Sequence, residues 1–109
     1  MNQVNIIGFI GQDAAIRTIK NGNKMANISV ATNESWQDKQ GQWHKRTEWH
    51  RVVAFGDIAT KYHLTKGQKV SITGRLRTRQ YEQAGIKRSV TEIVAMRIEL
   101  LKHTTKEAA

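Results

Sequence analysis

The period-two arrangement of side chains along residues 47–56 is the sequence feature that most restricts the fold of this chain. The run Thr47–Gly56 is rich in β-branched and aromatic residues with period two, which is typical of a β-strand. One face of such a strand carries Trp49, Arg51, Val53 and Phe55, and the other carries Val52 and Ala54. Two interpretations are open: either the aromatic rings belong to a core, or this face receives something flat and anionic.

A second run, residues 69–79, alternates in the same way and carries a row of cations. One face holds Arg75, Arg77, Arg79 and then Tyr81, whereas the other holds Ile72, Gly74, Leu76 and Thr78 and suits a core. No acidic residue lies between Gly67 and Glu82, although solvated faces usually mix both signs of charge. Bases of a single-stranded nucleic acid stack on aromatic rings, and its phosphates attract cations. The pattern therefore favours a nucleic-acid-binding face over a merely solvated one.

Composition narrows the class of partner. The 109 residues include 18 Lys and Arg against 9 Asp and Glu, for a net charge of +9 and a pI near 10.3. This surplus indicates a polyanionic partner, nucleic acid before membrane. No stretch approaches the ~20 apolar residues of a membrane span and no signal-peptide pattern is present, so we expect no membrane partner and a cytoplasmic, nucleoid-associated location. The absence of cysteine excludes disulfides and thiolate sites.

The remaining patterns complete a barrel of strands. We predict a first strand over Val4–Gly11, a short continuation from Ile16, a hairpin at Asn21–Asn23, and a second strand through Ala26, Ile28 and Val30. Residues 33–46 are interpreted as a long, mobile loop. Its Trp36 and Trp43 suggest a contact surface, with packing back on the sheet as the alternative. A helix capped by Asp57 is expected over 57–66, followed by strands over 69–79 and 87–101. Five strands with one short helix between the third and fourth predict an all-β OB-fold, a Greek-key barrel over residues 1–101 with a short flexible end at 102–109.

Several motifs resemble those of bacterial single-stranded-DNA-binding proteins (SSB). They are Ala31–Trp36, the run Thr47–Val53 with Phe55–Gly56, and Gly74–Arg79, with Gly11–Asp13 and Asn27–Ile28 fitting as well. The resemblance runs from Asn2 to about Leu100. It implies an OB-fold that binds single-stranded DNA without sequence preference in replication, recombination or repair, usually as a homotetramer, with a dimer as the smaller alternative.

The resemblance also implies roles for individual residues. Matching positions make Trp36, Trp49 and Phe55 base-stacking residues, with Tyr81 where many members have a further tryptophan. Arg51, Arg77 and Arg79 would follow the phosphate backbone. His50 would lie at a subunit interface, and the first strand, with Asn2, Val4 and Ile6, would pair with its copy in another subunit.

Cellular members of that family continue into a Gly/Pro/Gln-rich linker and an acidic tip that recruits partner proteins. This chain has neither after Leu101, so we expect no tail-mediated recruitment. It is either a naturally short member, of the kind carried by a phage or mobile element, or a trimmed form of a longer protein.

Other functions find less support in the sequence. Glu48 and His50 share a strand face, but no third metal ligand has a recognisable spacing, so we expect no metal site, no cofactor, no catalytic residues and no enzyme. An RNA-binding OB module stays open, because stacking and phosphate contacts read the sugar poorly. A replication-restart accessory that acts mainly through protein contacts also stays open. The stacking set Trp36, Trp49, Phe55 and Tyr81 argues against this alternative.

Overall fold

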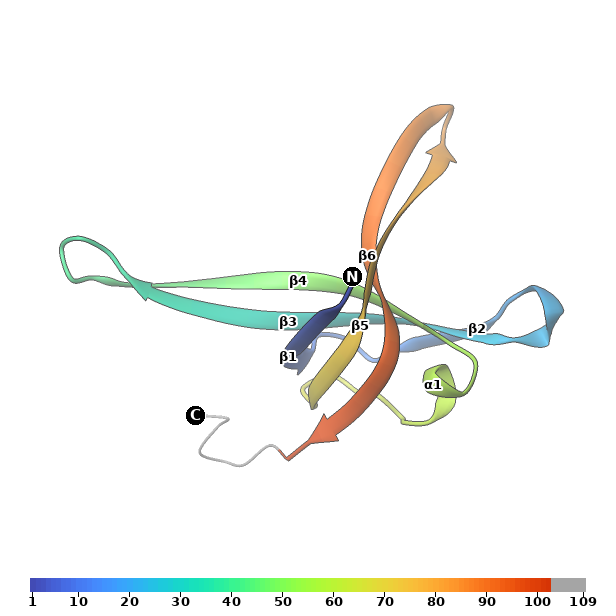
Figure 1. The fold of residues 1–109 in the computed structure, drawn as a ribbon, viewed down its shortest axis with the longest axis horizontal. Helices are drawn as coiled ribbons and strands as arrows, with labels where there is room; N and C mark the ends of the chain where they lie inside the picture. The colour runs from blue at the N-terminus through green and yellow to red at the C-terminus, as the bar shows by residue number, and fades with distance from the viewer. Residues whose placement is uncertain (103–109) are drawn as a thin grey trace.

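The computed structural model describes residues 1–102, which form six strands and two short helical segments (Figure 1). In chain order they are β1 (Val4–Ile10), β2 (Ala15–Thr18), the 3-10 turn η1 (Lys20–Gly22), β3 (Lys24–Gln37), β4 (Trp43–Phe55), α1 (Asp57–Thr60), β5 (Lys69–Gln83) and β6 (Ile86–Leu101). In this part of the chain, no helix is both long and apolar enough to cross a membrane.

Five of the strands close into a barrel. Their order is β1-β5-β6-β4-β3, and β1 pairs with β3 to close the circle, while β2 lies at the outer edge of β3. All pairings are antiparallel except that of β4 with β6. The predicted OB-fold is confirmed, including the position of the helix between the strands around Trp49 and Arg77.

Small and branched aliphatic side chains fill the barrel. The buried set includes Ile10, Ile28, Val30, Val52, Val70 and Ile72, and α1 covers one end with Ala59. One irregularity lies in β6: the register with β5 shifts between Thr73 and Gly74, because Arg97 and Ala95 are their partners and Met96 is passed over. This bulge adds one residue to β6 and so changes which positions face the core. Ile93, Ala95 and Ile98 all face the core, although they are not spaced two residues apart throughout.

The helix is shorter than predicted. It covers Asp57–Thr60 rather than 57–66, and its N-cap is Gly56 at φ 65°, so the prediction that Asp57 caps it is wrong. The chain leaves the helix because Leu64 turns into the core and its carbonyl accepts a hydrogen bond from the amide of Ala14.

The long loop expected over residues 33–46 is instead an arm of two paired strands. β3 and β4 stay in register from Met25–Phe55 to Gln37–Trp43, so only residues 38–42 connect them. Cross-strand bonds such as Thr47 Oγ1 to Asn33 Oδ1, at 2.8 Å, support the pairing beyond the barrel. Figure 1 shows this arm projecting far from the barrel, as does a second hairpin made by β5 and β6. Polar composition alone suggested a loop, and the β-pairing of Thr, Ser and Trp residues overrides it.

Candidate nucleic-acid interface

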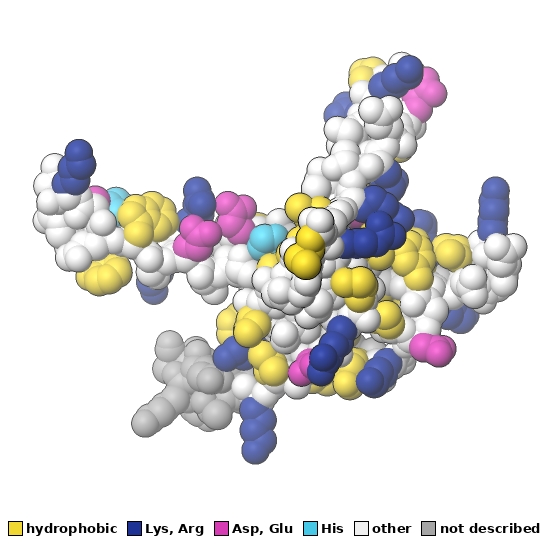
Figure 2. Space-filling model, viewed as in Figure 1, with side chains coloured by type: hydrophobic (Ala, Val, Ile, Leu, Met, Phe, Trp, Pro, Cys, Tyr) yellow, Lys and Arg dark blue, Asp and Glu magenta, His cyan; other side chains and the backbone are white. Residues whose placement is uncertain are grey.

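One surface of the barrel gathers the cations and rings singled out in the sequence. We call it the outer face, since it points away from the core side of β4, β5 and β6. Its members are Trp49, Arg51 and Phe55 from β4, Arg75, Arg77, Arg79 and Tyr81 from β5, and Arg88 and Glu92 from β6. Figure 2 shows dark blue side chains gathered where the β5–β6 hairpin leaves the barrel. Six of the seven predicted DNA-binding residues thus share one surface.

Glu92 lies at the centre of this face, and sequence reasoning did not single it out. Its side chain is buried, with 1 % of the residue exposed. Its Oε1 accepts hydrogen bonds from Arg77 Nη2 at 2.7 Å and from Arg79 Nε at 3.0 Å. Arg77 is directly opposite Glu92 in the β5–β6 register, so the strand pairing itself brings the two together. The two arginines are therefore anchored to one carboxylate rather than freely solvated.

The two arginines decide the ionisation of Glu92. Burial by itself would raise the pKa of this carboxyl, because it disfavours the charged form. Hydrogen bonds from Arg77 and Arg79, together with their charges, outweigh burial and hold the pKa of Glu92 below its ordinary value. Glu92 is thus a carboxylate at neutral pH, and the three side chains together carry one net positive charge.

Both anchored arginines lie over aromatic rings. The Arg77 guanidinium carbon is 5.7 Å from the centre of the Phe55 ring, and that of Arg79 is 5.8 Å from the Tyr81 ring. Such contacts between a cation and a ring face are favourable and align planar groups. Glu92 and the rings together therefore restrict the directions of the two guanidinium groups.

Trp49 stands at the other end of the outer face, with 61 % of its surface exposed. Its ring lies over Gly11, where the Cβ of any other residue would collide with the ring carbons. Beside it, Gln12, Asp13, Asn27, Ser29 and Arg51 line an open hollow of about 450 Å³. Glycine at residue 11 thus leaves the space that the Trp49 ring occupies next to the backbone.

Trp36 does not join the outer face. It is opposite His44 in the β3–β4 arm, and their rings stack with centres 5.5 Å apart and an angle of 20° between planes. Arg46 covers the same indole at 6.0 Å. His44 Nε2 lies 2.8 Å from Asp38 Oδ2, and the pKa of Asp38 is lowered, chiefly by this hydrogen bond. Trp36 therefore belongs to a separate polar cluster near the end of the arm.

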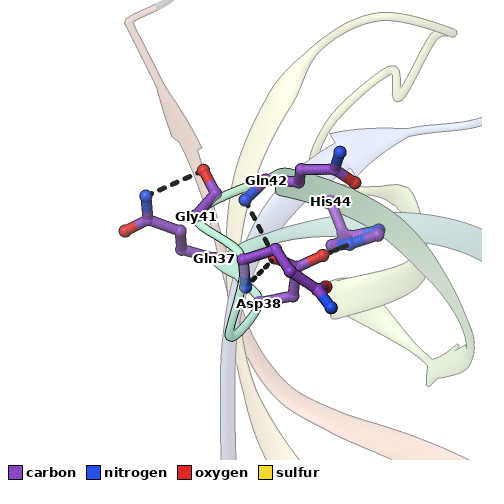
Figure 3. Close-up of polar contacts among 6 residues, drawn as sticks. Gln37, Asp38, Gly41, Gln42 and His44 are labelled. Carbon is purple, nitrogen blue, oxygen red and sulfur yellow. Dashed lines mark hydrogen bonds and ion pairs between the residues drawn. The ribbon is translucent and has the colours of Figure 1, made fainter.

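Asp38 also shapes the turn that ends the arm (Figure 3). Its Oδ1 accepts hydrogen bonds from the amides of Gln40 and Gln42, both at 2.9 Å, while Gln37 Nε2 donates to the Gly41 carbonyl. Gly41 has a φ of 79°, which favours glycine. These bonds fix the turn, and the bond between Asp38 and His44 ties the turn to β4.

The predicted interface residues lie elsewhere. Asn2 extends β1, because its side chain both donates to the Leu76 carbonyl and accepts from the Leu76 amide, each at 2.9 Å. Val4 and Ile6 are half-buried against the core, whereas Ile7 is exposed. Among residues 1–102, β1 pairs with β3 only through Phe9 and Ile10. His50 is half-buried on the core side of β4, where its Nε2 lies 2.8 Å from Thr32 Oγ1.

Comparison with known proteins decides the family. The sequence model of the single-strand binding protein family matches residues 1–101. The chain belongs to this family. Its fold is similar to that of the SSB of Plasmodium falciparum, solved in complex with single-stranded DNA, at 32 % identity and a TM-score of 0.83, covering 94 % of this chain and 96 % of that one.

Two structures of the SSB from Thermus aquaticus are also similar. The wild type is 31 % identical with a TM-score of 0.81, and a deletion variant is 31 % identical with a TM-score of 0.84. Each match covers 94 % of this chain but only 50 % and 51 % of those chains, respectively. This chain thus corresponds to about half the length of the Thermus SSB chains.

Proposed function

We propose that this protein binds single-stranded DNA, without regard to sequence, along the outer face. The observation that carries the proposal is one surface on which Trp49, Phe55 and Tyr81 alternate with guanidinium groups while the one acidic member, Glu92, is buried. Stacking on rings and attraction of phosphates need no base-edge contacts, so every sequence is accepted. The likeness to an SSB solved with single-stranded DNA supports the same conclusion.

Roles on this face follow from side-chain chemistry. We assign base stacking to Trp49, Phe55 and Tyr81, and phosphate contacts to Arg51, Arg77 and Arg79. Trp36 is assigned a separate stacking role, which requires the strand to reach the other side of the arm. The protein would coat and protect DNA at the nucleoid in the cytoplasm during replication, recombination or repair, acting by binding rather than by catalysis.

A direct test compares nucleic acids of equal length. Fluorescence anisotropy measures binding of four labelled ligands: oligo(dT), a mixed-sequence DNA strand, the duplex of that strand, and the matched RNA. We expect tight and similar binding of both single DNA strands and much weaker binding of the duplex. Preference for RNA would favour an RNA-binding module instead. Weak binding to every nucleic acid would favour a role through protein contacts.

We further propose that the protein assembles into a homotetramer, with a dimer as the smaller alternative. β1 offers a strand edge at Val4 and Ile6 that β3 does not cover, and exposed Ile7 is adjacent. Pairing of β1 with its copy would satisfy this edge and bury apolar surface. His50 is proposed for a second interface. Light scattering at micromolar concentration tests the assembly, and a monomer would contradict it.

A further inference from the structure

The arm formed by β3 and β4 has two chemically different sides. Its register is regular throughout, so side chains alternate between the sides. We call one the outer side, because it continues the outer face; its β4 members are Trp43, Lys45, Thr47, Trp49 and Arg51. The other, the acidic side, carries Trp36 and Glu34 from β3, His44, Arg46 and Glu48 from β4, and Asp38 from the turn.

Every acidic residue of the arm lies on the acidic side and has a basic partner there. Glu34 and Glu48 lie 3.2 and 3.4 Å from Arg46 Nη2, and Asp38 is paired with His44. The outer side contains Lys45 and Arg51 and no acidic residue. Figure 2 shows the same separation, with magenta side chains along one edge of the arm and a hydrophobic and a basic side chain along the other. The outer side is thus complementary to a polyanion as far as the turn.

Trp43 is the most exposed of the three tryptophans, with 70 % of its surface exposed, compared with 61 % for Trp49 and 44 % for Trp36. Trp36 is already covered by His44 and Arg46. Within residues 1–102, Trp43 has no ring or cation partner. Six positions of β-strand separate it from Trp49, which is about 20 Å, with Lys45 between them.

We propose that Trp43 is a further base-stacking site, so that the bound DNA strand continues from Trp49 along the outer side to the end of the arm. This inference rests on the proposed function and extends its path. Charge complementarity selects the occupant: a strand with bases and phosphates uses both the indole and Lys45, whereas an apolar partner protein would leave Lys45 unpaired. The site lies beyond the barrel, on the segment whose sequence had suggested a mobile loop with Trp36 and Trp43 as a contact surface.

A variant with Trp43 as its single tryptophan tests this site directly through its fluorescence. In the variant Trp36→Phe with Trp49→Phe, Trp43 is the only indole of the chain. Its fluorescence should be quenched when oligo(dT) is added to saturation, with saturation established separately by anisotropy of a labelled strand. Saturated binding with unchanged Trp43 emission would overturn this inference and leave the proposed function standing. Failure of the wild-type protein to bind any single strand would overturn both.

A substitution series separates stacking from simple apolar contact. Trp43→Phe keeps a ring, Trp43→Leu keeps apolar bulk without one, and Trp43→Ala removes both. Since stacking contributes about 1–3 kcal/mol per base and 1.4 kcal/mol corresponds to tenfold, Ala and Leu should each weaken binding about fivefold or more, and Phe less. Wild-type affinity of the Leu variant would overturn stacking. Circular dichroism of all three variants should match wild type, because the indole is exposed.

Discussion

Arg77 donates a 2.7 Å hydrogen bond to Glu92, and this buried carboxylate also accepts a bond from Arg79. An acidic residue at the centre of a DNA-binding face would ordinarily repel phosphates. Here Glu92 is buried, and its negative charge is neutralised by two guanidinium groups that lie over Phe55 and Tyr81. We interpret Glu92 as a positioning residue that sets the direction of the cations rather than as a DNA contact.

Glu92→Gln should therefore weaken DNA binding although it adds a unit of positive charge. Without the carboxylate, two neighbouring guanidinium groups repel each other, and charge-assisted bonds are replaced by weaker ones. We expect a loss of about 1–3 kcal/mol in the free energy of unfolding as well. Glu82→Gln is the matched control: Glu82 is exposed on the same hairpin and should leave binding equal or slightly tighter. Anisotropy titrations of both variants measure the difference, and tighter binding by Glu92→Gln would refute the positioning role.

The stability of the protein should depend on pH through Glu92. The pKa of this carboxyl is lowered in the folded state, so it contributes stability that is fully present above the ordinary value of about 4.3 and is lost as the pH falls through the folded value. Urea unfolding of wild type and Glu92→Gln between pH 7 and 3 measures this contribution. The difference between the two proteins should shrink on acidification. A constant difference would show that Glu92 does not titrate as proposed.

Substitutions at Gly11 and Trp49 should have non-additive effects on the stability of the protein. The backbone of Gly11 does not require positive φ, so Gly11→Ala acts mainly through collision of its Cβ with the indole. We expect a loss of about 1–3 kcal/mol in stability, as for other overpacked sites, and a shifted Trp emission. In the Trp49→Ala background the same substitution should cost much less. A double-mutant cycle measured by urea unfolding tests this coupling, which additive effects would disprove.

Arg51 should contribute to the salt dependence of DNA binding. It is exposed on the outer face and has no ion pair within the described part of the chain. If it contacts one phosphate, Arg51→Ala should flatten the slope of log K against log salt by about 0.7, and Arg79→Ala should act in the same direction. Lys61→Ala removes an equal charge next to α1 and should leave the slope unchanged. An unaltered slope in Arg51→Ala would show that the bound DNA does not run past Arg51 on β4.

Period-two patterns were enough to predict the barrel, because buried and more exposed residues alternate clearly around Ile28 and Ile72. They failed where both sides of a strand are solvated. The arm over residues 33–46 has no apolar face, so its pairing depends on cross-strand contacts that a single stretch of sequence does not display. Glu92 escaped notice for a related reason: an isolated Glu in a strand looks solvated until the register places Arg77 opposite it. The resemblance implied a stacking role for Trp36 but not its contacts with His44 and Arg46, which arise only when the hairpin pairs β3 with β4.

Binding of oligo(dT) by wild type, Trp49→Phe and Trp49→Ala tests the central claim most directly, because Trp49 is the exposed ring that the outer face presents beside Arg51. Anisotropy at one fixed salt concentration, with circular dichroism to establish the fold, gives the three affinities. Stacking predicts that Trp49→Ala loses about 1–3 kcal/mol of binding free energy and that Trp49→Phe loses less. Equal affinities for all three folded proteins would contradict DNA binding along the outer face.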